Sequence, residues 1–238
     1  MDERSTTGAS MEGDAWLKEF IAHVSHEFKT PLATLKLSAN YLLKYRHKIT
    51  EDAIDEKLRQ ILMQADLLSY SVHNISKLRK AEKDKIIISK TKTNLIDLLQ
   101  KEIAVAEKKF NNSHKIEFQC SETVLEIETD EDIFHDVFSN ILDNAFKFSP
   151  GKQRIVMTLK KYQEFVEVEI KDEGIGIAAD EINNVFDSFY RGSNATHSPG
   201  MGLGLALVKQ GVAALNIKLQ IESQINKGTS VRVEIPRS

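Results

Sequence analysis

The feature that most limits how this chain can fold is a heptad pattern of apolar residues between positions 54 and 75. Its members are spaced alternately by four and three residues, and they are Ile54, Leu58, Ile61, Ala65, Leu68, Val72 and Ile75. A seam sustained over three repeats predicts a long amphipathic helix that packs against other helices along its length. Thr50 stands just before the pattern and is a plausible N-cap.

A second apolar stripe precedes this seam and runs from Leu17 to Leu42 in steps of three or four residues. Polar residues 45–52 separate the two stripes, so we expect an antiparallel helical hairpin over residues 14–85. Such a thin hairpin buries little surface alone, and a homodimeric four-helix bundle is the natural solution. We interpret residues 1–13 as a flexible lead or an expression remnant.

The pattern changes after residue 85. Apolar residues with a helical period predict helices over 94–109, 132–148 and 205–215, and β-branched or alternating runs predict strands. The strands are expected at 115–120, 124–128, 155–160, 165–172, 217–223 and 230–235, and residues 86–88 form a short β-branched run. We therefore expect a linker over 86–92 and, over 93–238, an α+β two-layer sandwich with helices on one face of a mainly antiparallel sheet.

Composition excludes several classes of protein. The charge sum is 32 − 35 = −3, which argues against a nucleic-acid partner. The single cysteine, Cys120, excludes an internal disulfide and a cysteine-rich zinc site. No apolar run approaches the ~20 residues of a membrane-spanning helix. We expect a cytoplasmic location, with a membrane involved only through an upstream sensor region, if at all.

His26 is the histidine with the most informative neighbours. It lies two positions from both Val24 and Phe28, about 200° around the helix from each, and therefore points away from the apolar stripe. A lone exposed histidine usually has no function. Here, however, Glu27 can hydrogen-bond the imidazole, and Pro31 cannot donate to the carbonyl of Glu27, so the helix should bend. This combination indicates a possible nucleophile.

Two asparagines, Asn140 and Asn144, share one face of the helix predicted over 132–148. Their amide oxygens suit Mg²⁺, and Lys147 could supply a charge for phosphates. Asp143 could border the same site or simply be solvated. Spaced asparagines are more often surface residues, but no Walker-type phosphate loop is present to offer another nucleotide site.

The sequence from Asp172 to Ile177, DEGIGI, follows a predicted strand. A carboxylate only accepts hydrogen bonds, which suits the exocyclic amine of adenine. Gly174 and Gly176 would let the backbone approach a flat base, although a glycine-rich turn is the simpler interpretation.

A second group of glycines, Gly200, Gly202 and Gly204, precedes and opens the helix predicted over 205–215. Backbone N–H groups at a helix start attract phosphate. Residues 192–199 contain no large apolar anchor, so we expect a mobile lid there.

Each of these motifs is weak alone, but their order is specific. Ser25–Leu32, SHEFKTPL, closely resembles the H-box of sensor histidine kinases. The succession of the asparagine helix, DxGxG, the aromatic segment VFDSFYRG, GxGxG and KGTSVRVEIP resembles the N, G1, F, G2 and terminal G boxes of the GHKL ATPases. Together the motifs resemble the catalytic core of two-component histidine kinases over residues ~15 to 238.

The resemblance implies an ATP- and Mg²⁺-dependent histidine autokinase with phosphatase activity toward its partner. His26 would be phosphorylated, Glu27 would assist proton removal, and the phosphoryl group would pass to a response-regulator receiver domain. Thr30 would orient water during dephosphorylation of that regulator. The motif departs from the usual pattern at Phe28 and Lys29, where Leu and Arg are more usual.

The resemblance also implies the residues of the nucleotide site. Asn144 would ligate Mg²⁺, and Phe186 and Phe189 would anchor the lid. Phe148 stands where tyrosine is frequent, so it can stack or pack but offers no phenolic hydrogen bond. The complete implied set is Asn140, Asn144, Lys147, Phe148, Asp172, Gly174, Gly176, Ile177, Arg191, Gly200, Gly202, Leu203, Gly204 and Thr229.

Two other classes of protein share part of this pattern. A GHKL ATP hydrolase of the chaperone or gyrase type lacks an H-box on a helical hairpin. A scaffold without kinase activity would bind regulators without chemistry, but the presence of His26, Asn144 and Asp172 argues against it.

Overall fold

The computed structural model describes residues 6–83, 87–110, 114–149, 151, 154–195, 198 and 200–237. Within residues 6–83, it describes the side chains at 21, 22, 24, 25 and 27–77 only. The chain divides into two compact units, Met1–His73 and Asn74–Ser238. This division falls inside the second helix and earlier than the boundary predicted at residue 85.

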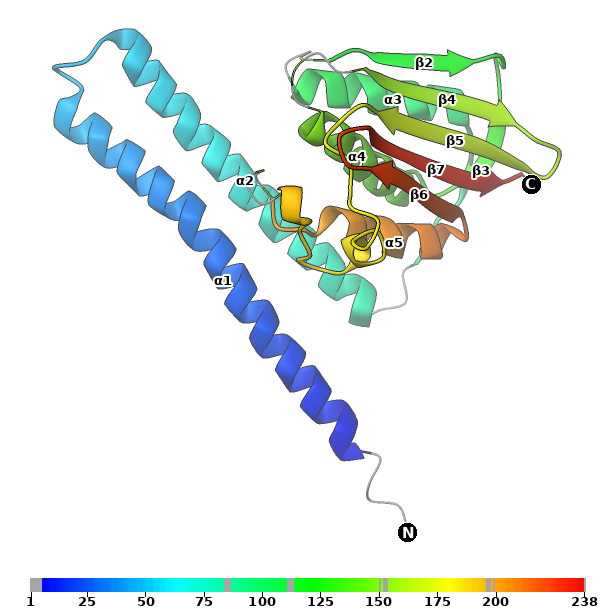
Figure 1. Ribbon diagram of the computed structural model, residues 1–238, viewed down its shortest axis with the longest axis horizontal. Helices are drawn as coiled ribbons and strands as arrows, with labels where there is room; N and C mark the ends of the chain where they lie inside the picture. Colours follow the sequence, from blue (N-terminus) through cyan, green and yellow to red (C-terminus); the bar gives the residue numbers. More distant parts are fainter. Residues whose placement is uncertain are drawn as a thin grey trace. The chain divides into compact units, whose positions relative to one another are not determined.

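The first unit is the expected helical hairpin. Helix α1 covers Thr6–Tyr45 and helix α2 covers Glu51–Lys83 (Figure 1). The Thr50 hydroxyl oxygen accepts a hydrogen bond from the backbone N–H of Ala53 at 3.3 Å, as predicted for an N-cap. Ser38 of α1 donates to Gln60 of α2 at 3.0 Å, which links the two helices.

Helix α1 begins earlier than expected, because residues 6–13 are helical rather than an irregular lead. The segment 1–13 contains glycines but no proline, so no residue in it forbids a helical turn. Pro31 lies inside α1, and the helix continues on both sides of it.

The heptad seam of α2 has two registers with different exposure. Ile54, Ile61, Leu68 and Ile75 are spaced by seven residues and are all partly covered within the hairpin. In the other register, Leu58 is 46% exposed and Val72 is 55% exposed. The hairpin therefore covers one register of the seam better than the other.

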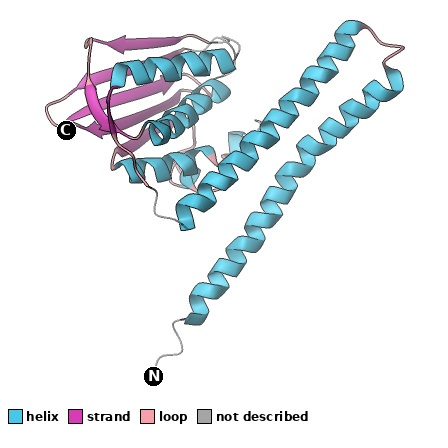
Figure 2. Ribbon diagram, turned by 180° about the vertical axis from the view of Figure 1, so that it is seen from behind, coloured by secondary structure: helices cyan, strands magenta, loops and turns pink. Residues whose placement is uncertain are grey.

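The second unit is built around a five-stranded sheet with the strand order β2-β4-β5-β7-β6. Helices α3, α4 and α5 lie on one face of this sheet (Figure 2). The elements are α3 (Leu95–Lys109), β2 (Ile116–Cys120), α4 (Glu131–Phe148), β4 (Ile155–Lys161), β5 (Phe165–Asp172), α5 (Gly204–Leu215), β6 (Lys218–Gln224) and β7 (Gly228–Pro236). The predicted two-layer sandwich is confirmed.

The sheet is mixed, although mainly antiparallel as predicted. β2 pairs with β4 in parallel, because the chain crosses over through β3 (Glu126–Thr129) and α4 before it returns. The β4–β5, β5–β7 and β6–β7 pairs are antiparallel. β3 pairs with β1 (Thr91–Asn94) in a separate two-stranded sheet.

The β-branched run 86–88 lies in the segment that we expected to be a linker. Ile86 lies outside the described residues, and Ile87 and Ile88 precede β1 without belonging to a strand. Ile87 is 92% exposed, so its β-branched side chain has no packed sheet face to occupy.

The core lies between the helices and the sheet. Phe134 and Phe138 of α4 stack with ring centroids 4.2 Å apart, and both are almost fully buried. Ile155 and Met157 of β4 are fully buried on the inner face of the sheet, since alternate residues of a strand point to the same side. This core holds α4 firmly, and α4 carries the asparagines of the predicted site.

Candidate nucleotide site and phospho-acceptor helix

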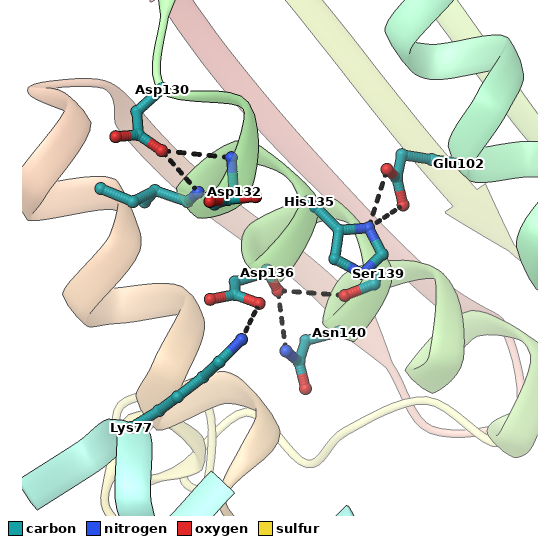
Figure 3. A network of polar contacts seen from close by, with 9 residues as sticks. Lys77, Glu102, Asp130, Asp132, His135, Asp136, Ser139 and Asn140 are labelled. Atoms are coloured by element: carbon teal, nitrogen blue, oxygen red, sulfur yellow. Dashed lines mark hydrogen bonds and ion pairs between the residues drawn. The ribbon is translucent and has the colours of Figure 1, made fainter. Parts of the chain in front are cut away.

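Asn140 faces the start of α5. Its side chain is 6% exposed, and its amide nitrogen donates to the Asp136 carbonyl of the same helix at 2.7 Å (Figure 3). Its amide oxygen, Oδ1, lies 3.0 Å from the position that a Cβ on Gly204 would take. Asn144 lies one turn further along α4 and is half-buried. The structure thus brings the asparagine helix and the glycine-rich segment together.

The N-terminus of α5 is built without a side-chain cap. Leu203 is its N-cap residue, and no side-chain hydrogen bond caps the helix there. Gly200 and Gly202 have φ angles of 135° and 69°, which a residue with a Cβ rarely adopts. Backbone N–H groups at this uncapped helix start are therefore suited to an anion.

Lys147 lies beside this segment. Its Nζ atom is 2.8 Å from the position of a Cβ on Gly200 and 4.6 Å from the centroid of the Phe148 ring. Burial and, to a smaller extent, the nearby charge of Arg191 lower the pKa of Lys147 from 10.5 to about 8, while the charge of Asp143 partly opposes the shift. Two cations close together, one of them poorly solvated, favour the binding of an anion.

Arg191 also binds the segment that we expected to form a lid. Its guanidinium donates to the carbonyl oxygens of Ala195 at 3.0 Å and Ser198 at 2.5 Å. Residues 193–195 form a short 3₁₀ helix, and residues 196, 197 and 199 lie outside the described residues. The predicted lid stays a prediction.

Asp172 ends β5, and its side chain is buried. Its Oδ1 accepts the backbone N–H groups of Gly174 at 2.8 Å and Thr229 at 3.2 Å. Neither of these hydrogen bonds uses the second oxygen, Oδ2. Burial raises the pKa of Asp172 above its ordinary value, and the two backbone hydrogen bonds oppose the shift because they favour the ionised form. A buried carboxylate of this kind can accept a hydrogen bond from an amine.

The glycines after Asp172 serve the protein's own backbone. A Cβ on Gly174 would lie 2.3 Å from the Phe148 carbonyl oxygen, and one on Gly176 would lie 2.0 Å from the Gln224 carbonyl oxygen. A Cβ on Gly228 would likewise lie 1.9 Å from the Asp172 carbonyl oxygen. These contacts fix the loop on which Asp172 is presented, a reason for glycine that the sequence interpretation did not include.

Ile177 and Thr229 meet at Ser223, a residue that the sequence reasoning missed. The Ser223 hydroxyl accepts the backbone N–H of Ile177 at 2.8 Å and lies 2.9 Å from the Thr229 hydroxyl. Asn194 was also missed, and its amide donates to the Gly176 carbonyl at 2.8 Å. No motif marked Ser223 or Asn194, because their partners are far away in the chain. Ser223 binds Ile177, and Asn194 binds Gly176.

The structure settles the position of Asp143. Its carboxylate forms an ion pair with Lys109 of α3 at 2.5 Å. Asp143 therefore contributes mainly to the packing of α3 on α4. Figure 3 shows a second link between α3 and α4, where Nδ1 of His135 lies 2.9 Å from a carboxylate oxygen of Glu102. The same figure shows an ion pair between Lys77 of α2 and Asp136 of α4.

The two aromatic residues expected to anchor the lid are half-buried. Phe189 adopts a φ of 68°, which is uncommon for a bulky residue, and its N–H donates to the Gly202 carbonyl at 3.0 Å. Phe186 ends a short 3₁₀ helix, Asn184–Phe186. The aromatic segment therefore adjoins the second glycine motif.

The H-box residues belong to the helical unit. The backbone at His26 is part of α1, but its side chain lies outside those described. Glu27 is half-buried and Thr30 is exposed, one turn before Thr34, whose hydroxyl donates to the Thr30 carbonyl at 3.1 Å.

The described residues contain no group of three or more His, Cys, Asp or Glu side chains that could hold a metal ion. Among the same residues, no helix is long and apolar enough to cross a bilayer.

Comparisons with known proteins agree with this architecture. Residues 16–83 match the family "His Kinase A (phospho-acceptor) domain", and residues 129–238 match the "Histidine kinase-, DNA gyrase B-, and HSP90-like ATPase" family. An ATPase unit of this type preceded by a phospho-acceptor hairpin defines one class of protein. Residues 16–83 and 129–238 thus have the two-domain arrangement of the catalytic core of two-component sensor histidine kinases.

The chain is similar to curated sensor proteins along most of its length. It is 29% identical to the sensor protein KdpD of Clostridium acetobutylicum over 99% of this chain and 26% of KdpD. It is 30% identical to the sensor kinase WalK of Staphylococcus epidermidis over 92% of this chain and 36% of WalK. The chain thus spans about a quarter to a third of these relatives.

A solved structure shows the same fold. Histidine kinase ThkA, in complex with the response regulator TrrA, superposes with a TM-score of 0.72 at 18% identity, covering 100% of this chain and 68% of that one.

Proposed function

We propose that this chain is an ATP-dependent histidine autokinase that phosphorylates His26 and passes the phosphoryl group to an aspartate of a response regulator. The observation that carries the proposal is the proximity of two cations, Lys147 and Arg191, beside the uncapped start of α5, since these groups together favour the binding of an anion. The family assignment supports the reaction, and ThkA provides a relative solved with a response regulator.

We assign the adenine to the other end of the site. The Asp172 carboxylate accepts the exocyclic amine, while Gly174, Gly176 and Ile177 shape the loop beside it. Thr229 supports the carboxylate through its backbone N–H. Lys147, Arg191 and the backbone of 200–204 then receive the phosphates.

The donor atoms fit Mg²⁺ bound together with nucleotide. Amide oxygens of Asn144 and Asn140 are the hard ligands that this ion prefers, and Mg²⁺ usually takes only one or two protein ligands beside phosphate oxygens. When bound, the ion neutralises charge that develops on the phosphates. Asn140 is held for this role because its amide nitrogen is bound to the Asp136 carbonyl.

His26 carries the chemistry on the helical unit. An imidazole nitrogen forms a bond to the γ-phosphorus while the bond to the leaving oxygen of ADP breaks, and Glu27 accepts the imidazole proton. Phosphohistidine then transfers its phosphoryl group to a carboxylate oxygen of the regulator as the N–P bond breaks, and the imidazole takes back the proton held by Glu27, which restores its neutral form. We propose a homodimer through the hairpin, and a cytoplasmic position because ATP and receiver domains are found there.

Labelling with ATP that carries 32P in its γ-phosphate tests this function. We expect the unaltered chain to incorporate a label that is acid-labile and base-stable, and His26→Ala to incorporate none while it still binds ADP. His47→Ala, which changes an exposed histidine next to Arg46, is the matched control. Labelling of His26→Ala at the level of the unaltered chain would place the phosphorylated residue elsewhere.

The phosphatase activity is tested separately through Thr30. Because its exposed hydroxyl lies one turn after His26, we expect it to orient the water that attacks the phosphorylated regulator. Thr30→Ala should slow regulator dephosphorylation by about tenfold or more and leave autophosphorylation within about twofold. Equal losses in both rates would make Thr30 a structural residue.

A further inference from the structure

Ser223 of β6 joins the two chain segments that lie next to Asp172. Its half-buried hydroxyl accepts the backbone N–H of Ile177 at 2.8 Å and donates to the Gly228 carbonyl oxygen at 2.8 Å. The same hydroxyl lies 2.9 Å from the hydroxyl of Thr229, its cross-strand partner on β7. Ser223 is therefore in contact with both sides of the proposed adenine site, although no motif includes it.

These three contacts use the whole hydrogen-bonding capacity of the Ser223 hydroxyl, which has one proton to donate and two lone pairs to accept. The Gly228 carbonyl can only accept, so the Ser223 proton is directed to it. The Ile177 N–H occupies one lone pair, and the second lone pair is left for the Thr229 hydroxyl. All three contacts are satisfied together only when Thr229 donates its proton to Ser223.

This direction of the hydrogen bond decides what Thr229 can offer to a ligand. Its proton is held by Ser223, so its oxygen can only accept a further hydrogen bond. The backbone N–H of Thr229 donates to the Asp172 carboxylate at 3.2 Å, which places the two residues side by side. Two neighbouring acceptors suit the 6-amino group of adenine, whereas a base with a carbonyl oxygen at that position requires a donor.

We propose that Ser223 is a positioning residue that sets the base specificity of the nucleotide site. By accepting the Thr229 proton, it fixes the Thr229 hydroxyl as an acceptor for the 6-amino group of adenine and so disfavours nucleotides with a 6-oxo base. Ser223 acts through Thr229 and does not itself touch the nucleotide. The inference rests on the proposed function, because it assumes that a base binds next to Asp172.

Binding of ADP and IDP to the full chain, measured by calorimetry, tests the proposal. IDP has the ribose and phosphates of ADP, but its base carries a carbonyl oxygen in place of the amino group and a proton on the adjacent ring nitrogen. In Ser223→Ala the Thr229 hydroxyl can rotate and donate to that carbonyl oxygen. We expect the unaltered chain to prefer ADP and Ser223→Ala to reduce this preference about fivefold.

Ser230→Ala is the matched control, because it removes another hydroxyl of β7, one that donates to the Glu169 carboxylate at 2.7 Å. It should leave the preference unchanged. Thr229→Val keeps the shape of the side chain and removes the hydroxyl through which Ser223 acts. In a chain that already carries Thr229→Val, Ser223→Ala should therefore change the preference by less than about twofold.

Equal weakening of ADP and IDP in Ser223→Ala would show that Ser223 only supports the loop, and this result would overturn the proposal. An unchanged preference in Ser223→Ala, or the same reduction with and without the Thr229 hydroxyl, would also overturn it. So would an unaltered chain that binds ADP and IDP equally well.

Thr229→Val alone decides the question if Ser223→Ala does not fold. It should weaken ADP about fivefold and IDP by less than about twofold, and equal weakening of both nucleotides would count against the proposal. An unaltered chain that binds neither nucleotide would instead contradict the proposed function, which separates that failure from the failure of this inference.

Discussion

At the scale of single residues, the environment of Lys147 shows how the fold prepares a site for phosphate. The amino group is removed from water by packing near Gly200 and Phe148, and it lies close to a second cation, Arg191. Both effects disfavour the protonated form and lower its pKa to about 8. A bound phosphate reverses the second effect, so nucleotide binding and protonation of Lys147 are coupled.

This coupling predicts a pH dependence of nucleotide affinity. Below about pH 8 Lys147 is protonated and attracts phosphate, and above it the free protein must first take up a proton. The affinity for ADP, measured by calorimetry, should therefore fall as the pH rises from 7 to 9. Lys147→Met should bind ADP about tenfold or more weakly at pH 7 and lose this decline.

Adenosine is the control ligand for that experiment, because it has no phosphate and its affinity should not change over the same range. Stability of the free protein should follow the opposite trend. The unfolded chain keeps its lysine proton up to pH 10.5, so between about pH 8 and 10.5 the folded state gains stability from Lys147 as the pH rises. An ADP affinity that is constant from pH 7 to 9 would contradict the assignment.

At the scale of elements, the position of α4 depends on its N-cap. Asp130 accepts the N–H groups of Asp132 and Ile133 through Oδ1, at 3.1 Å each (Figure 3). Its Oδ2 accepts the N–H of Ser89 at 2.7 Å. The cap thus fixes both the start of α4 and the segment before β1. Asn94 has the same role for α3, since it accepts the N–H of Ile96 at 3.3 Å.

We expect Asp130→Ala to lower the free energy of unfolding by about 2 kcal/mol, because it removes the cap and leaves the Ser89 N–H without its acceptor. Urea unfolding followed by circular dichroism measures the change. Asp132→Ala alters an exposed carboxylate in the first turn and should cost only about 0.5 kcal/mol. Equal costs for the two variants would show that the capping contacts contribute little.

At the scale of the whole molecule, the exposed register of the α2 seam requires a partner. Leu58 and Val72 remain about half exposed although they belong to an uninterrupted heptad pattern. A second copy of the hairpin would cover these positions in a four-helix bundle, which agrees with the proposed homodimer.

The double variant Leu58→Glu/Val72→Glu should therefore be monomeric in sedimentation at concentrations where the unaltered chain is a dimer. Charged side chains in a helical seam cannot be desolvated without a large cost. Leu43→Glu is the control, since Leu43 is more exposed than either residue and lies outside the seam. A double variant that remains dimeric would place the interface elsewhere.

Much of this protein is determined by local sequence. The heptad seam, the period-two alternation of 155–160 and 165–172, and the order of the asparagine and glycine motifs each predict structure within a few residues of themselves, and the helices, strands and sandwich are found as expected.

Only the tertiary structure decides which distant groups share an environment. The pKa of Lys147 depends on Arg191, the glycine at position 176 is needed because of the Gln224 carbonyl, and Asp143 forms an ion pair with Lys109 of α3. Desolvation and close backbone contact arise from chain segments that are far apart in sequence, and periodicity or spacing along one segment carries no record of them.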